Sequence, residues 1–144
     1  MAPCLLDVNV LIALLWPAHE SYAKAQRWFA RHARQGWATC PITQAAFVRV
    51  VSNPAFSPDA PTTQEAAAVL EANLKHPEHQ FWADDIGFAE SVRTLKLSGH
   101  RQVTDAYLLG LALHKRARFA TLDRSLASLL PSGSPARSQI ELIA

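Results

Sequence analysis

Three aspartates in this chain each lie beside a short segment with the pattern of a buried element. Asp7 follows the run 4–6, Asp123 follows the run 118–122, and Asp105 stands at the start of an apolar helical segment. Open α/β sheets bind ligands outside the carboxyl ends of their strands, so we expect these carboxylates at one edge of a sheet. Mg²⁺ takes oxygen ligands and retains several waters. The first hypothesis is therefore a small metal-dependent phosphodiesterase.

Each aspartate also has a structural interpretation that needs no ligand. Asp7 is placed to cap a helix over 8–15, and Asp123 to cap a helix over 124–130. Asp105 is placed to stabilise the positive end of the late helix. Each of these roles explains one residue at a time. The three positions in combination favour a shared metal site.

The segments that position these residues alternate between strand-like and helical patterns. We expect strands over residues 3–6, 37–40, 80–82, 119–121 and 140–143. We expect helices over residues 8–15, 20–34, 41–52, 63–75, 84–97, 103–116 and 124–130. Strands separated by helices of this length predict a parallel sheet with right-handed crossovers. The predicted fold class is α/β, a three-layer α/β/α arrangement with a central parallel sheet, as a single domain over 1–144.

The composition is that of an ordinary globular protein with one hydrophobic core. Of 144 residues, 49% are hydrophobic and 18% charged, and the net charge of +2 gives only weak support for a polyanionic partner. Cys4 and Cys40 lie in apolar runs, so we expect buried free thiols. No apolar stretch approaches the roughly 20 residues that span a bilayer, and the amino terminus lacks the features of a signal peptide. We expect a cytoplasmic protein with no membrane contact.

Three longer segments carry a resemblance to a known family. They are LLDVNVLIALL at 5–15, CPITQAAFVRVVSNP at 40–54 and VTDAYLLGLALHKRARFATLDRSLA at 103–127. In this order and spacing the chain resembles a PIN domain, most closely the VapC-type toxins of bacterial toxin–antitoxin pairs, over nearly its whole length. The resemblance implies a PIN-like fold and an endoribonuclease that uses Mg²⁺ or Mn²⁺ and a metal-activated water to hydrolyse RNA. It also implies a cognate antitoxin as partner and a homodimer.

The acidic site of that family maps onto this sequence with one departure. The resemblance assigns Asp7, Asp105 and Asp123 as metal ligands, and it places the fourth catalytic position at Gln44, where the family has a glutamate. A glutamine still offers a neutral carbonyl oxygen to a cation or its water. Because one negative charge is lost, we expect weaker cation binding, or one metal where four carboxylates hold two. An alternative function follows, in which a PIN-like protein binds RNA or a partner with weak or no cleavage.

Two other charged groups have both a functional and a structural interpretation. Asp84 and Asp85 are placed to cap the predicted helix over 84–97, and they are also the nearest candidates to replace the carboxylate lost at position 44. Basic residues follow helical spacing in one stripe and gather near the late aspartates in a second group. The stripe is Lys24, Arg27, Arg31 and Arg34, and the group is Lys115, Arg116, Arg118 and Arg124. Both sets are consistent with RNA phosphate contacts and with solvated helix surfaces.

Overall fold

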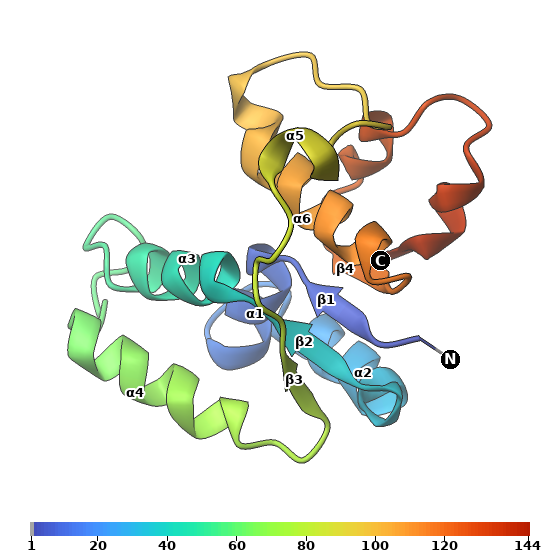
Figure 1. Cartoon of the computed structure of the whole chain (residues 1–144). Coiled ribbons are helices and arrows are strands. Elements are labelled where there is room, and N and C mark those ends of the chain that lie inside the picture. The colour runs from blue at the N-terminus through green and yellow to red at the C-terminus, as the bar shows by residue number, and fades with distance from the viewer. Residues whose placement is uncertain (1) are drawn as a thin grey trace.

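The computed structural model describes residues 2–144 and is built around one five-stranded sheet (Figure 1). The strands are β1 (Cys4–Leu6), β2 (Trp37–Thr39), β3 (His79–Phe81), β4 (Arg118–Thr121) and β5 (Ile140–Leu142). Their order is β3-β2-β1-β4-β5, and every neighbouring pair is parallel. The prediction of a central parallel sheet is confirmed. The first strand of the chain is therefore the middle strand of the sheet.

Helices cover the two faces of the sheet in separate layers (Figure 1). One layer contains α1 (Val8–Leu15), α2 (Tyr22–His32), α3 (Pro41–Val51) and α4 (Thr63–Leu74), and the other contains α5 (Phe88–Ser91) and α6 (Val103–His114). Short 3₁₀ turns lie at Ala33–Gln35, His100–Gln102, Leu126–Leu129 and Pro135–Gln139. The three-layer prediction is confirmed.

The alternation of side chains along β1 explains why the sheet has two separate cores. Cys4 and Leu6 pack into the core beneath α1 to α4, whereas Leu5 packs into the core beneath α6. Successive side chains of a strand point to opposite faces, so a run of three apolar residues serves both cores. Both predicted free thiols are buried, as expected for strand and helix-start positions, and burial raises the pKa of Cys4 to about 11.

The start of α3 fixes the position of residue 44 relative to the sheet. Pro41 occupies the first turn, and the Thr43 hydroxyl accepts a hydrogen bond from the Cys40 backbone N–H at 3.0 Å. A proline at this position has the dihedral angle that a helix needs and lacks an N–H that would be unpaired. The helix therefore begins directly after β2, and Gln44 lies in its first turn.

The predicted helix over 84–97 is wrong. Only Phe88–Ser91 is helical, and residues 82–86 have no regular secondary structure before Gly87, the cap of α5. Tertiary contacts hold this segment in place: the Tyr107 hydroxyl donates to the Ile86 carbonyl at 2.9 Å, and Asp85 pairs with Lys115 at 3.4 Å. Asp84 and Asp85 therefore cap no helix. Within residues 2–144, no helix is long and apolar enough to cross a membrane.

Candidate active site

Asp7 occupies the turn between the middle strand and α1. It caps α1, and its side chain is only 4% exposed. Its Oδ1 accepts a hydrogen bond from the Val8 backbone N–H at 2.7 Å, and its Oδ2 accepts one from the Thr121 hydroxyl at 2.7 Å. The capping role is therefore real. Capping does not explain the second hydrogen bond of Asp7, because its donor, Thr121, belongs to a neighbouring strand.

Thr121 and Asn9 join the end of β1 to the end of β4. The Thr121 Oγ1 accepts a hydrogen bond from the Asp123 backbone N–H at 3.0 Å while donating to Asp7. The Asn9 Oδ1 accepts from the Leu122 backbone N–H at 3.2 Å. These bonds fix the direction of the Asp7 carboxylate and the path of the chain that leads to Asp123.

Asp105 and Asp123 lie at the same edge of the sheet. Asp105 is half-buried in the first turn of α6, and Asp123 follows β4. The Oδ1 of Asp123 accepts hydrogen bonds from the backbone N–H and the hydroxyl of Ser125, at 2.9 and 2.7 Å. Its other oxygen has no hydrogen-bond donor within the described part of the chain, so it is available to a ligand.

Burial and neighbouring negative charge shift the pKa values of the carboxylates at this edge. Burial raises the pKa of Asp7 to about 6, and the negative charges of Asp105 and Asp123 add to the rise, while the Thr121 and Val8 hydrogen bonds oppose it. Burial, followed by the charge of Asp123, also raises the pKa of Asp105. No ion pair among residues 2–144 involves any of the three. The edge therefore carries negative charge without a compensating cation side chain.

This donor set fits a hard divalent cation such as Mg²⁺ or Mn²⁺, which prefers carboxylate oxygens. Among the residues described, no three His, Cys, Asp or Glu side chains are grouped closely enough to hold a metal ion directly. Mg²⁺ is usually held by one or two carboxylates and keeps several waters, so a hydrated ion fits this wider spacing. The assignment of Asp7, Asp105 and Asp123 as metal ligands stays a prediction.

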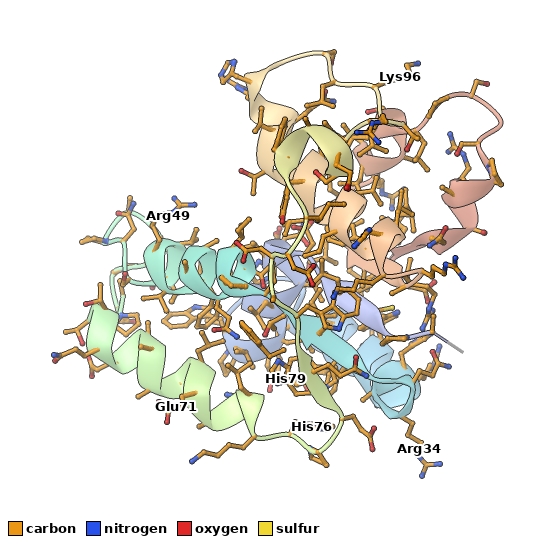
Figure 2. The ribbon with its side chains drawn as sticks, viewed as in Figure 1. Arg34, Arg49, Glu71, His76, His79 and Lys96 are labelled. Atoms are coloured by element: carbon orange, nitrogen blue, oxygen red, sulfur yellow. The ribbon has the colours of Figure 1, made fainter. Side chains whose placement is uncertain are left out.

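Gln44 is directed toward a polar group that sequence reasoning missed. Its Nε2 donates to the Thr39 hydroxyl at 2.9 Å, and that hydroxyl is 2.8 Å from the Nε2 of His79. Burial is the main cause of the lowered pKa of His79, which keeps its ring neutral near pH 7. In the described residues, no hydrogen bond links Gln44 to the three aspartates. Figure 2 shows His79 and His76 at the β3 side of the sheet.

Asp85 does not take the place of the missing carboxylate. Its partner Lys115 directly follows α6, whereas Asp105 lies in the first turn of that helix. Ten residues of helix separate the two positions, a rise of about 15 Å. The ion pair therefore directs the Asp85 carboxylate toward Lys115 rather than toward Asp105.

Comparison of the sequence with known proteins assigns the chain to a family. The sequence profile of the PIN domain matches residues 4–129. The chain belongs to the PIN domain family. Ribonuclease VapC38 of Mycobacterium tuberculosis (strain ATCC 25618 / H37Rv) is 44% identical over 125 residues, which cover 87% of this PIN domain chain and 88% of the relative. Ribonuclease VapC39 of Mycobacterium tuberculosis (strain CDC 1551 / Oshkosh) is 43% identical over 131 residues, covering 90% and 94%.

A solved structure supports the same fold for this PIN domain. The crystal structure of VapBC2 from Rickettsia felis bound to a DNA fragment from their promoter contains a chain that superposes with a TM-score of 0.61. The sequence identity is 14%, and the match covers 88% of this chain and 92% of the other. At that identity the comparison supports the fold alone.

Thr39 and Thr121 occupy equivalent places in this PIN domain, because each is the last residue of a strand that neighbours β1. From the sequence, Thr121 could face either the site or the core, and no pattern assigns Thr39 or His79 to the site. The sequence signal for the contacts of Thr39 and Thr121 is the same in both cases: a threonine at the end of a predicted strand, a few residues before a predicted site residue. The structure assigns Thr121 to Asp7 and Thr39 to Gln44.

The substitution Gln44→Glu is expected to strengthen binding of Mn²⁺ by roughly tenfold or more. A carboxylate adds a charge–charge attraction of several kcal/mol at about 4 Å near a protein surface, before the cost of desolvation. The Thr39 hydroxyl can donate to the new carboxylate, so the local bonding survives. Calorimetric titration measures the affinity, with Gln64→Glu on the exposed surface of α4 as the control for added charge. Equal affinities for wild type and Gln44→Glu would place residue 44 outside the reach of the ion.

Proposed function

We propose that this PIN domain is a metal-dependent endoribonuclease and acts as the toxin of a toxin–antitoxin pair. The observation that carries the proposal is the coupling of Asp7, Asp105 and Asp123 at one edge of the sheet, in a chain whose relatives are named ribonucleases. Three uncompensated carboxylates suit a cation that binds an RNA phosphate. The scissile group is therefore a phosphodiester of RNA, and the attacking group is water.

The residues of the chain have separate roles in this reaction. Asp7, Asp105 and Asp123 would hold Mg²⁺ or Mn²⁺, which would supply a coordinated water of lowered pKa and polarisation of the scissile phosphate. Thr121 orients Asp7 through its hydroxyl, and Asn9 fixes the backbone between Thr121 and Asp123. Gln44 contributes a neutral side chain where a fourth carboxylate is expected. No covalent intermediate on the protein is required.

A basic recess beside the catalytic edge supports RNA as the substrate. Lys24, Arg27 and Arg31 of α2 line a recess of about 140 Å³ together with residues 142–144. The Ile143 backbone N–H donates to the carbonyl of Thr121 at 2.9 Å. Ile143, which lines the recess, is therefore bonded directly to Thr121, whose hydroxyl bonds Asp7. None of the three cations has an ion-pair partner among the described residues. They are available to phosphates.

Arg34 does not belong to this recess, contrary to the four-residue stripe expected from helical spacing. The helix α2 ends at His32, and Arg34 lies in the following 3₁₀ turn. Figure 2 shows the side chains of Arg34, Arg49 and Lys96 at separate places on the periphery. These three provide a matched set of exposed cations for comparison.

Replacement of Lys24, Arg27 and Arg31 together by glutamine is expected to weaken RNA binding and to flatten its salt dependence. Each phosphate contact contributes about 0.7 to the slope of log affinity against log salt for single strands, so the slope should fall by about two. The readout is binding of a labelled single-stranded RNA at several salt concentrations. The control replaces Arg34, Arg49 and Lys96. If both triple variants lose the same amount of RNA affinity, the loss reflects the lower net charge and not the recess.

The activity itself is tested with purified protein freed of any bound partner. We expect cleavage of single-stranded or looped RNA in Mg²⁺ or Mn²⁺ and no cleavage in EDTA. If the wild type cuts no RNA in either metal while Gln44→Glu does, the chain is an RNA-binding or partner-binding PIN domain with its catalysis lost at position 44. If neither protein cuts or binds RNA, the ribonuclease proposal fails.

A protein partner forms part of the proposal. The solved neighbour is a VapBC complex, and that complex binds a promoter DNA fragment. By analogy, the product of an adjacent gene should bind this chain and suppress its cleavage of RNA. Co-purification of the two products, followed by a cleavage assay with and without the partner, tests this, and sedimentation of the isolated chain tests for the homodimer.

A further inference from the structure

A second recess borders the catalytic edge on the α6 side of the sheet. It has a volume of about 530 Å³ and lies between the start of α3, the segment that leads into α5 and the start of α6. Its apolar walls include Ile42, Phe88 and Val103, and its polar groups are Asp84 and Thr104. Most small-ligand sites have volumes of about 300–1,000 Å³ and combine apolar walls with a few polar groups. This recess has both properties.

The position of the recess ties it to the same substrate as the aspartates. Thr104 directly precedes Asp105 in α6, and Ile42 lies two residues before Gln44 in α3. A phosphate bound beside Asp105 therefore has this recess within the reach of the nucleoside attached to it. The ligand that the recess receives in this way is a nucleobase.

The floor of the recess is a fixed aromatic surface. Phe88 is 44% exposed, and its ring is nearly parallel to that of Tyr107, with 6.5 Å between centroids and 11° between planes. Tyr107 is held in turn by the hydrogen bond from its hydroxyl to the Ile86 carbonyl. Unpaired bases of single-stranded RNA stack on exposed aromatic side chains of this kind. The solvent-facing side of Phe88 provides the platform.

Asp84 supplies the polar recognition group. Its neighbour Asp85 is paired with Lys115, but Asp84 has no hydrogen bond or ion pair within residues 2–144. A carboxylate accepts two parallel N–H bonds from one planar partner. Guanine is the RNA base that presents two adjacent N–H donors, N1–H and the N2 amino group, on its Watson–Crick edge. The Thr104 hydroxyl is a donor for the guanine O6.

We propose that this recess binds a guanine base next to the scissile phosphate, stacked on Phe88 and bonded through its N1–H and N2 amino group to Asp84. The inference rests on the proposed ribonuclease function and adds a base preference to it. Asp84 acts as a specificity-determining residue and takes no part in holding the cation.

The test compares two labelled hexanucleotides that differ at one position, guanosine in one and inosine in the other. Inosine lacks the N2 amino group and is otherwise the same base. Binding to the full chain is measured by fluorescence anisotropy in EDTA, so that neither RNA is cut. Wild type should bind the guanosine RNA about tenfold more tightly, as loss of one hydrogen bond to a charged group predicts. Asp84→Asn should reduce this ratio to about one, and Asp85→Asn should leave it unchanged.

Two further variants test the platform and the nature of the occupant. Phe88→Ala should weaken binding of the guanosine RNA, whereas Phe81→Ala, which removes another exposed ring, should not. Equal binding of both RNAs by wild type, or equal loss of the ratio in Asp85→Asn, overturns the proposal. The proposal is also overturned if Phe88→Ala converts a dimer to a monomer in sedimentation while the ratio of guanosine-RNA to inosine-RNA affinity is unchanged. The recess would then be an interface between two copies of the chain. Absence of all RNA binding in EDTA together with absence of all cleavage in Mg²⁺ or Mn²⁺ would instead overturn the ribonuclease function itself.

Discussion

Asp7→Asn is expected to abolish RNA cleavage while stabilising the metal-free fold at neutral pH. The activity is lost because the central carboxylate of the site is neutralised. The stability rises because burial of the wild-type carboxylate, with a smaller contribution from two neighbouring negative charges, raises its pKa to about 6 from an ordinary value of 3.8. The folded protein therefore holds this proton more tightly than the unfolded chain does. Stability contributed by the group is lost as pH increases from about 4 to about 6.

The size and pH dependence of this effect are measurable. The difference between the two pKa values corresponds to roughly 3 kcal/mol at pH 7, and an asparagine should recover about 1–2 kcal/mol of it because its hydrogen bonds are weaker. Denaturant unfolding in EDTA should show this gain at pH 7 and little gain near pH 4. Asp59→Asn in an exposed loop is the control. A large loss of stability in Asp7→Asn at pH 7 would mean that the cap of α1 and the Thr121 bond outweigh the repulsion.

Gly110→Ala is expected to destabilise the fold by about 3 kcal/mol or more. A Cβ at this position in α6 would lie 2.1 Å from the backbone oxygen of Ser91 and 2.7 Å from its carbonyl carbon. Backbone atoms cannot move aside as the end of a long side chain does, so α5 must separate from α6. The usual gain of about 1 kcal/mol from replacing a helix glycine by alanine is too small to compensate.

Thermal unfolding of Gly110→Ala measures this cost, and Gly99→Ala serves as the control. A Cβ at Gly99 would meet no atom within 4 Å, so that variant should unfold like the wild type. If Gly110→Ala matches the wild type, the contact between α5 and α6 is loose in solution. The recess that includes Phe88 would then have a movable wall.

Much of the fold was predictable because the local patterns agree with the tertiary structure. The residues before Asp7 and Asp123 form strands. The residues after Thr62 form the expected helix, and it begins with a capping box in which Thr62 and Glu65 bond each other's backbone at 3.1 and 2.9 Å. Short-range rules suffice for such elements. The pairing of strands as a parallel sheet followed from the lengths of the helices between them.

The failures have one physical cause, which is contact between residues distant in sequence. Residues 84–87 have a helix-starting pattern, yet they form no helix, and the hydrogen bond from Tyr107 and the ion pair with Lys115 hold them in place. The same holds for Gln44, because its partner Thr39, the last residue of β2, in turn contacts His79, which lies 40 residues further along the chain. Sequence reasoning predicted that the three aspartates meet at one edge as metal ligands, and their role as ligands stays a prediction. It had no means to find which hydroxyls orient them.

The hydrogen bond between Asp7 and Thr121 joins positions that are 114 residues apart. A ribosome releases the amino-terminal strand first, and that strand becomes the middle of the sheet, so its partner β4 is synthesised long afterwards. Until residues 118–123 have left the exit tunnel, Asp7 has no Thr121 to orient it and no Asp123 beside it. An unfinished polypeptide therefore cannot assemble this catalytic edge. A cell that makes the protein is protected from its RNA-cleaving chemistry during nearly the whole time of translation.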